Sequence, residues 1–205
     1  MASGSEPTAS EIAALGDPRP LEPAEAERAA RSIARAFAWH EPWGDWAMPD
    51  PSDREERIYA QFHRDLLERF IPYGECWTIG AGTATTMWVP PGVEQLASRR
   101  TEAAYAAYGD RADDLRAGDA LIASLKPKTE HWYLDTIATD PDLHGQGLGG
   151  RLLDHDLAIR DAAGDACALD THTPENISFY ARRGFEVIGE GRLGAGLDVY
   201  MMFRK

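Results

Sequence analysis

Apolar residues recur at helical spacing through the first third of the chain. Residues 22–42 form an amphipathic pattern that predicts a helix, and Pro23 suits its first turn. A second helix is predicted where apolar residues recur every four positions, at Ile58, Phe62, Leu66 and Phe70. Ser52 and Glu55 have capping-box spacing ahead of this stripe, and Pro72 is expected to end the helix.

Stretches rich in β-branched and aromatic residues predict the strands. These stretches are residues 75–80, 83–92, 131–139, 166–171, 185–190 and 197–204, and the first two are joined by a glycine-containing turn. A further short strand is predicted near residues 11–15. Between the strands, residues 93–125 are Ala-rich and predict two helices with a break at Gly109.

Two more helices are predicted in the last third of the chain. The first spans residues 147–163. The second begins at Pro174, which fits the first helical position, with Thr173 as its cap and Gly184 as its C-terminal stop. The overall order is helix–helix, strand–strand, two helices, then β-α-β-α-β-β. This order predicts an α/β (α+β) fold in which helices pack on one mixed sheet.

The length of the chain suits one domain. We place a single domain at residues 21–205 of the 205-residue chain. Residues 1–20 are rich in Ser, Pro, Gly and Ala, and are expected to form a flexible arm.

The formal net charge of −13 disfavours a nucleic-acid partner, because phosphates would be repelled. It is compatible either with simple solubility or with attraction of a cationic substrate. No apolar run reaches the roughly 18 residues that a membrane span needs, and no secretory signal is visible. The two cysteines, Cys76 and Cys167, and the lone histidines have no metal-ligand spacing, so we expect no metal and a cytoplasmic location.

Four glycines lie close together, at positions 145, 147, 149 and 150, where a strand gives way to a helix. Gly145, Gly147 and Gly150 satisfy G-x-G-x-x-G, and Asp170 follows 20 residues after the last of them. A dinucleotide-binding unit is nevertheless disfavoured. Residues 140–144 separate the strand from the first glycine, and too little chain follows to complete a doubly wound sheet.

The segment "HGQGLG" resembles the Q/R-x-x-G-x-G/A motif of the GNAT superfamily of N-acetyltransferases. Backbone N–H groups at a helix N-terminus suit the diphosphate of acetyl-coenzyme A (acetyl-CoA), and glycine allows close approach. His144 departs from the motif, because the family has Gln or Arg there. The resemblance implies acetyl-CoA as cosubstrate, bound by Ile137, Ala138, Thr139, His144, Gly145, Gln146, Gly147, Leu148, Gly149, Gly150, Asn176 and Tyr180.

A second segment, "ENISFYARRGF", resembles the later signature of the same family. The resemblance implies that Asn176 contacts the pantetheine arm and that the Tyr180 hydroxyl points at the sulfur. The segment "HWYL" and the Leu169-Asp170-Thr171 triplet are most similar to the puromycin N-acetyltransferase-like group. The implied fold is a mixed, mostly antiparallel sheet flanked by helices, with the helical insert between the third and fourth strands.

Acetyl transfer to an amine requires a neutral amine, a stabilised oxyanion and a protonated leaving thiolate. Tyr180 is the candidate general acid, and the Ile137 N–H is the candidate donor to the acetyl carbonyl. Asp135 and Asp170 are alternative candidates for the base, directly or through water. Strand alternation is expected to place Asp135 in the cleft, on the same face as Tyr133 and Ile137.

Tryptophans offer flat faces to an aromatic or cationic acceptor, and the candidates are Trp39, Trp43, Trp46 and Trp88. The leading hypothesis is therefore an N-acetyltransferase that modifies a primary amine of a small molecule, such as an antibiotic or other secondary metabolite, by direct attack in a ternary complex. A protein or peptide N-acetyltransferase and a non-catalytic acyl-CoA-binding module remain as alternatives. A homodimer is compatible with the sequence, and no membrane partner is expected.

Overall fold

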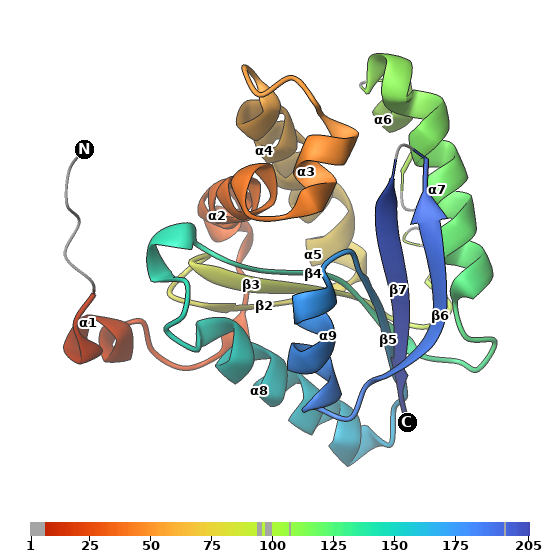
Figure 1. Cartoon of the computed structure of the whole chain (residues 1–205). Coiled ribbons are helices and arrows are strands. Elements are labelled where there is room, and N and C mark those ends of the chain that lie inside the picture. The colour runs from red at the N-terminus through yellow and green to blue at the C-terminus, as the bar shows by residue number, and fades with distance from the viewer. Residues whose placement is uncertain (1–6, 94–95, 97–99, 107, 195) are drawn as a thin grey trace.

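Seven strands form one sheet in the order β1-β2-β3-β4-β5-β7-β6 (Figure 1). The computed structural model describes residues 7–93, 96, 100–106, 108–194 and 196–205. The strands are β1 (Arg19–Pro20), β2 (Glu75–Ile79), β3 (Ala84–Val89), β4 (Trp132–Thr139), β5 (Cys167–Thr171), β6 (Glu186–Leu193) and β7 (Leu197–Arg204). All neighbouring strands run antiparallel except β4 and β5. The predicted mixed, mostly antiparallel sheet is confirmed.

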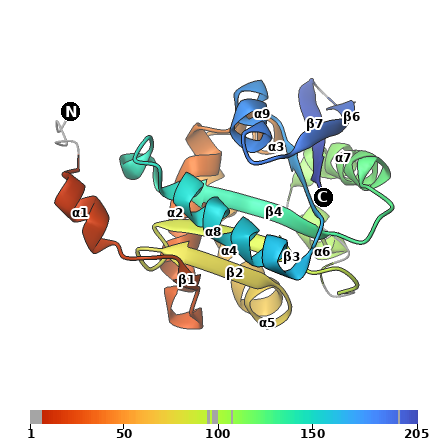
Figure 2. The same cartoon turned by 90° about the horizontal axis from the view of Figure 1, so that it is seen from below.

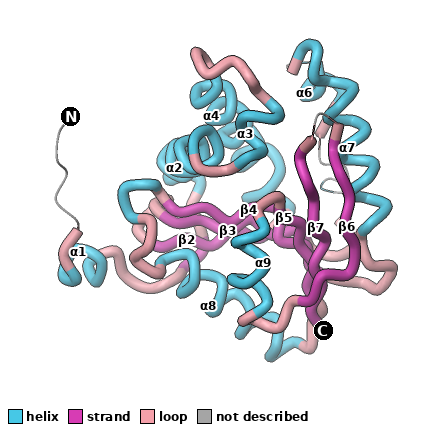
Figure 3. The backbone as a smooth tube through the Cα atoms, in the orientation of Figure 1, coloured by secondary structure: helices cyan, strands magenta, loops and turns pink. Residues whose placement is uncertain are grey.

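Helices cover both faces of this sheet (Figures 1 and 2). They are α1 (Ala9–Ala14), α2 (Ala26–Trp39), α3 (Pro42–Ala47), α4 (Arg54–Asp65), α5 (Ile71–Tyr73), α6 (Glu102–Ala106), α7 (Ala112–Leu125), α8 (Leu148–Ala163) and α9 (Pro174–Ala181). One apolar core joins α2, α4 and α7 to the sheet, and a second lies under α8 and α9. Along the chain, α6 and α7 form the helical insert between the third and fourth strands, as predicted, and in Figure 3 α7 lies beside β6.

The central strands diverge part-way along their length. β4 pairs with β5 only from Trp132 to Leu134, although β4 continues to Thr139 alongside β3. Between β3 and β4, Met87 faces Thr136 and Trp88 faces Leu134, so Asp135 is the extra residue of a β-bulge. Beyond the bulge, none of the described strands pairs with β4 on the side where β5 diverges.

The bulge also overturns the expected strand alternation. Tyr133 belongs to the core cluster on the α2 face, whereas Ile137 packs against the cluster on the α8 face. Because one extra residue shifts the side-chain register by one, the two residues point to opposite faces.

The buried four-residue stripe of the second helix is confirmed, since all four of its side chains are buried. Four residues turn an α-helix through about 400°, so such a stripe drifts by roughly 40° per repeat. A π-helical turn at Leu66–Phe70 (η2) follows α4 and widens the last repeat, which keeps Phe70 on the buried face. The helical path then continues through α5, so Pro72 does not end it.

Several local predictions near the N-terminus were wrong. Residues 9–14 form a helix rather than a strand, because Thr8 and Glu11 make a reciprocal capping box. The first strand is instead Arg19–Pro20, which pairs with β2 within the stretch expected to be an arm. At α4 the N-cap is Asp53 rather than Ser52, and it makes no side-chain cap.

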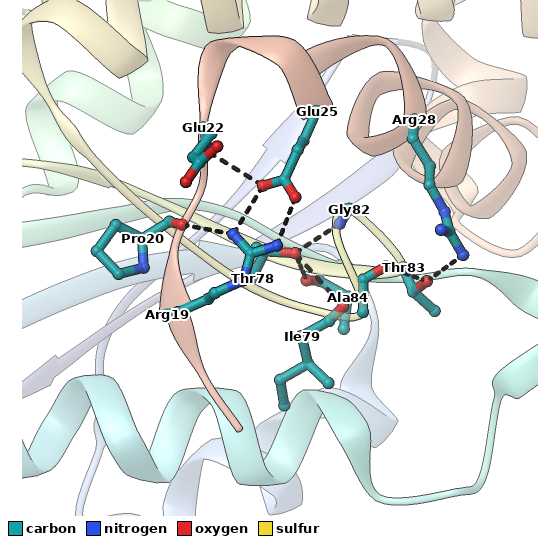
Figure 4. Close-up of polar contacts among 11 residues, drawn as sticks. Arg19, Pro20, Glu22, Glu25, Arg28, Thr78, Ile79, Gly82, Thr83 and Ala84 are labelled. Carbon is teal, nitrogen blue, oxygen red and sulfur yellow. Dashed lines mark hydrogen bonds and ion pairs between the residues drawn. The ribbon is translucent and has the colours of Figure 1, made fainter. Parts of the chain in front are cut away.

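Figure 4 shows how the β1 edge is held to the sheet. Arg19 forms an ion pair with Glu25, and its Nη1 also donates to the Pro20 carbonyl at 3.1 Å. In the β2–β3 turn, the Thr78 hydroxyl accepts from the Gly82 N–H at 2.7 Å and donates to the Ala84 carbonyl at 2.8 Å. These contacts anchor the β2–β3 hairpin, on which β4 aligns.

Candidate active site

A cavity of about 680 Å³ lies where β4 and β5 diverge. It is lined by residues of α2, α4, β4, β5, α9 and the glycine loop ahead of α8. Most of the predicted site residues line it, namely Trp43, Asp135, Ile137, Ala138, Thr139, His144, Gly145, Gly147, Leu148, Gly149, Gly150, Asp170, Asn176 and Tyr180. The strand divergence therefore brings the two sequence motifs to one cavity.

The glycine loop closes the cavity at the N-terminus of α8. Gly145 and Gly147 both have φ of +76°, with open space where a Cβ would lie. Such a φ favours glycine, so these two positions are required first for the backbone path. Gly147 is the N-cap of α8, whose 16 residues direct a helix dipole at the cavity. The loop thus has the shape and charge that a diphosphate needs.

The other two glycines allow close packing. A Cβ at Gly149 would lie 3.3 Å from the Thr139 hydroxyl, and one at Gly150 would lie 2.8 Å from Nη2 of Arg183. His144 contributes a side-chain contact, since its Nε2 lies 2.9 Å from the Thr139 carbonyl and ties the loop to the end of β4. The exception is Gln146. It is not part of the cavity wall, and its N–H lies 3.4 Å from the Leu143 carbonyl.

Tyr180 and Asn176 project from α9 into the cavity. Tyr180 is buried, and that burial together with the nearby negative charges of Glu41 and Asp170 raises its pKa above the ordinary tyrosine value, at which the phenol is already protonated at neutral pH. Asn176 Nδ2 lies 3.4 Å from Glu41 Oε1, and the Thr173 hydroxyl donates to Glu41 Oε2 at 2.9 Å. Thr173 is the N-cap residue of α9, but its side chain makes this contact instead of the predicted cap.

Asp170 lies near the end of β5 in a polar cluster. The Tyr133 hydroxyl donates to Asp170 Oδ1, and His172 Nε2 lies 3.5 Å from Oδ2. His172 Nδ1 lies 3.0 Å from the Asp198 carbonyl on β7. Sequence reasoning missed His172, although its position two residues after Asp170 at a strand end was a usable signal.

Asp135 projects from the β4 bulge, where the Thr136 hydroxyl donates to its Oδ2 at 3.0 Å. Asp65, at the end of α4, also lines the cavity and was not predicted. Burial raises the pKa of Asp65 and outweighs the opposing effect of Arg69, whose Nη1 lies 3.6 Å from Oδ1. A carboxylate directly before the buried Leu66 was the signal that could have identified it.

Of the four candidate tryptophans, the structure brings only Trp43 to the cavity. Trp88 is 0% exposed on the α8 face, where its indole N–H donates to Asp156 Oδ2 at 2.8 Å. Trp46 is buried in the core beside Gly118 of α7. Trp39 is 51% exposed, and its indole donates to Glu55 at 2.8 Å. The orientations of Trp39, Trp46 and Trp88 depend on core packing and, for the first two, on the rotation of their helices, which are long-range properties.

Aromatic side chains that were not predicted take the place of these tryptophans. Phe37 from α2, Phe62 from α4 and Phe70 from the π turn line the cavity beside Trp43. Phe37 packs edge-on against Trp43, with ring centroids 6.0 Å apart. The cavity wall therefore combines aromatic side chains and carboxylates with the glycine loop.

Comparison with known proteins bears on this arrangement. Residues 102–187 match the family model described as the acetyltransferase (GNAT) domain, a stretch that includes the glycine loop, α8 and α9. A Corynebacterium glutamicum structure described as a histone acetyltransferase HPA2 and related acetyltransferase superposes with a TM-score of 0.70, at 22% identity over 92% of this chain and 94% of that chain. The chain has the GNAT fold. The domain match supports an acyltransferase.

Two other similarities are narrower in what they show. A Thermoplasma acidophilum PaiA N-acetyltransferase in complex with coenzyme A has a TM-score of 0.55 and 14% identity, over 92% of this chain and 98% of that chain. A peptidyl-lysine N-acetyltransferase of Salmonella typhimurium is 31% identical over 61 residues, which is 30% of this chain. The matched segment covers 41% of the length of that curated relative.

Among the described residues, no helix is long and apolar enough to cross a membrane. The same residues contain no group of three or more His, Cys, Asp or Glu side chains placed to hold a metal ion.

Proposed function

We propose that this protein is an acetyl-CoA-dependent N-acetyltransferase that acts on a primary amine of a small molecule by direct attack in a ternary complex. One observation carries the proposal: a single cavity joins a glycine loop at a helix N-terminus to a buried tyrosine and the carboxylates of Asp135 and Asp170. The loop fits a diphosphate, and the polar residues fit proton transfer.

Two parts of the site support the proposed cosubstrate binding, one for the diphosphate and one for the pantetheine arm. The amides of residues 145–150 would hold the diphosphate, and the part of β4 that has left β5, at Ile137, Ala138 and Thr139, would align the pantetheine arm. Asn176 would contact the same arm after it moves away from Glu41. The bound cosubstrate supplies the activated acetyl thioester.

The chemical roles follow from position and protonation. Tyr180 is protonated at neutral pH and lines the cavity, so it is the proposed proton donor to the leaving sulfur. Asp135 and Asp170 lie on the two strands that border the divergence, and either can take a proton from the acceptor amine. The Ile137 N–H is the proposed donor to the acetyl carbonyl as negative charge develops on its oxygen.

The lining of the cavity supports an acceptor that combines an apolar or aromatic body with an amine. Phe37, Trp43, Phe62 and Phe70 supply flat surfaces, and Asp65 and Asp135 supply negative charge. An antibiotic or related secondary metabolite has this chemistry. Membership of the puromycin N-acetyltransferase-like group is part of this proposal, and an aminonucleoside is therefore a test substrate.

The test is release of free thiol from acetyl-CoA with a panel of amines, including aminonucleosides, arylalkylamines, polyamines and a lysine-containing peptide. Turnover of one small amine well above that of the peptide supports the proposal. A preference for the peptide would favour a peptide N-acetyltransferase, the activity named for the Salmonella relative. Tight acetyl-CoA binding without thiol release from any amine would instead indicate an acyl-CoA-binding module.

Location and assembly complete the proposal. Both cysteines are buried free thiols, which is compatible with a reducing cytoplasm. A homodimer is proposed as well. Light scattering on the purified protein at several concentrations would measure the mass in solution, and a constant monomer mass would refute the dimer.

A further inference from the structure

The cavity contains a histidine whose position suits proton transfer. His172 lies one residue beyond β5 and lines the cavity together with Asp170. Its ring bridges two strands, because Nδ1 lies 3.0 Å from the Asp198 carbonyl on β7 and Nε2 lies 3.5 Å from Asp170 Oδ2 on β5. The side chain is only 12% exposed, so both contacts are held by the surrounding structure.

These two contacts determine which ring nitrogen carries the hydrogen. A main-chain carbonyl can only accept, so Nδ1 must donate to Asp198. In the neutral imidazole, Nε2 then has a bare lone pair directed toward the Asp170 carboxylate. A proton on Nε2 would therefore lie between the imidazole ring and the Asp170 carboxylate.

We infer that His172 is the residue that stores the proton taken from the acceptor amine, with Asp170 as the group that passes it on. The inference rests on the proposed acetyl transfer. One N–H bond of the acceptor ammonium breaks, and its electron pair stays on nitrogen as the nucleophile. The proton crosses the Asp170 carboxylate and forms the Nε2–H bond of His172, which later releases it to water.

Basicity explains why the imidazole of His172 suits the role of final proton acceptor better than the Asp170 carboxylate does. In model peptides a carboxylic acid has a pKa of about 3.9 and an imidazolium of about 6.5, while an alkylammonium is near 10. An imidazole therefore holds a proton at neutral pH far better than a carboxylate does. Other polar groups surround Asp170 and His172. The Tyr133 hydroxyl donates to Asp170, and the Lys126 ammonium lies over the Tyr133 ring, 3.5 Å from its centroid. The Thr173 hydroxyl donates to Glu41.

The kinetic test compares two substitutions at this position. His172→Ala removes the imidazole, and we expect kcat to fall by about 10²-fold, the lower range for general base catalysis, with the KM for acetyl-CoA unchanged. Added imidazole should restore much of the lost rate through the cavity. His172→Gln can still donate to the Asp198 carbonyl but cannot take a proton, so it should stay slow.

Two further variants control for effects unrelated to proton transfer. His131→Ala serves as the matched control, because His131 Nδ1 also lies against a main-chain carbonyl, that of Thr129 at 2.6 Å, yet His131 is not part of the cavity wall. It should keep wild-type turnover. The double variant Asp170→Asn/His172→Ala should be no slower than the slower single variant, and imidazole should not rescue it.

A direct measurement on the wild-type protein does not depend on turnover. Long-range ¹H–¹⁵N spectra of the imidazoles should show His172 as the Nδ1–H tautomer when neutral. An Nε2–H tautomer would overturn the inference, as would wild-type kcat in His172→Ala or full activity in His172→Gln. A wild-type protein that releases no thiol with any amine would overturn the proposed function and the inference together, whereas an active wild type with an equally active His172→Ala overturns the inference alone.

Discussion

The two ends of α8 allow the proposed diphosphate site to be tested against an internal control. Gly147 caps the N-terminus with φ of +76°, and Gly164 caps the C-terminus with φ of +75°. Neither has an atom within 4 Å of where a Cβ would lie. Gly147→Val and Gly164→Val therefore introduce the same side chain, in the same backbone conformation, at the two ends of one helix.

The stability cost should be similar in the two variants. A left-handed conformation costs an L-residue roughly 1–2 kcal/mol, and a β-branched side chain lies at the upper end of that range. For a domain of this size, each kcal/mol lowers Tm by about 2–4 °C, so both variants should lose roughly 2–8 °C. Thermal unfolding followed by circular dichroism measures this.

Affinity for acetyl-CoA should separate the two variants. Only Gly147 lies in the loop proposed to hold the diphosphate, and a hydrogen bond to a charged group contributes about 1.5–3 kcal/mol. Loss of one such bond raises Kd roughly 10- to 150-fold. Calorimetry should show this for Gly147→Val and a wild-type Kd for Gly164→Val. Acetyl-pantetheine has no diphosphate, so its weaker binding should be equal in the two variants. Equal acetyl-CoA affinity in both variants would refute the site.

Three further predictions concern turnover and stability. Tyr180→Phe should lower kcat, by up to the 10²–10⁴-fold typical of general acid catalysis, while the Kd for acetyl-CoA stays constant; unchanged kcat with chemistry rate-limiting would remove Tyr180 from the mechanism. Asp170→Asn should lose kcat most at low pH and recover partly as pH rises and the free amine accumulates, whereas Asp135→Asn should mainly raise the KM for the acceptor. If the pH–rate profiles of both variants overlay that of the wild type, neither carboxylate is the base. Asp156→Ala should lower the free energy of unfolding by about 2–5 kcal/mol, because it leaves the Trp88 indole and the Thr86 hydroxyl unpaired in the core, whereas Asp156→Asn keeps an acceptor and should be milder.

The Asp156 prediction also has a defined pH dependence. Burial raises the pKa of Asp156 in the folded protein, so the folded state binds its proton more tightly than the unfolded chain does. Stability from this group is therefore fully present below the unfolded value of about 3.9 and is lost as pH rises through the folded pKa. In Asp156→Asn, the free energy of unfolding should change less with pH over this range. Urea unfolding at a series of pH values measures it, and the same dependence on pH as in the wild type would contradict the assignment.

Local signals explain what the sequence could predict. The glycine loop, α8 and α9 follow from capping residues, glycines and apolar spacing within short segments, and the structure has all three in the expected places. The insert between the third and fourth strands was equally visible from its Ala-rich composition. Each of these features depends on residues that are neighbours along the chain.

Long-range register explains what the sequence could not predict. The bulge at Asp135 exists because β3 and β4 pair out of step, and it sends Tyr133 and Ile137 to opposite faces. Trp88 looked like a substrate-binding residue, but Asp156 on the distant α8 determines which way its indole points. His172 gains its orientation from Asp198 on β7, 26 residues later in the chain.

The bulge and the strand divergence together give the cavity its chemistry. Since β4 leaves β5 after Leu134, the edge of β4 that follows is available to a pantetheine arm, while Asp170 remains on β5 across the gap. If β4 and β5 stayed paired to Thr139, ladder hydrogen bonds would occupy that edge. The anchoring of β3 to α8 through Asp156 keeps the glycine loop and β4 in one rigid frame. The same departure from regular pairing therefore exposes the backbone that would hold the cosubstrate and leaves the proposed proton acceptor beside it.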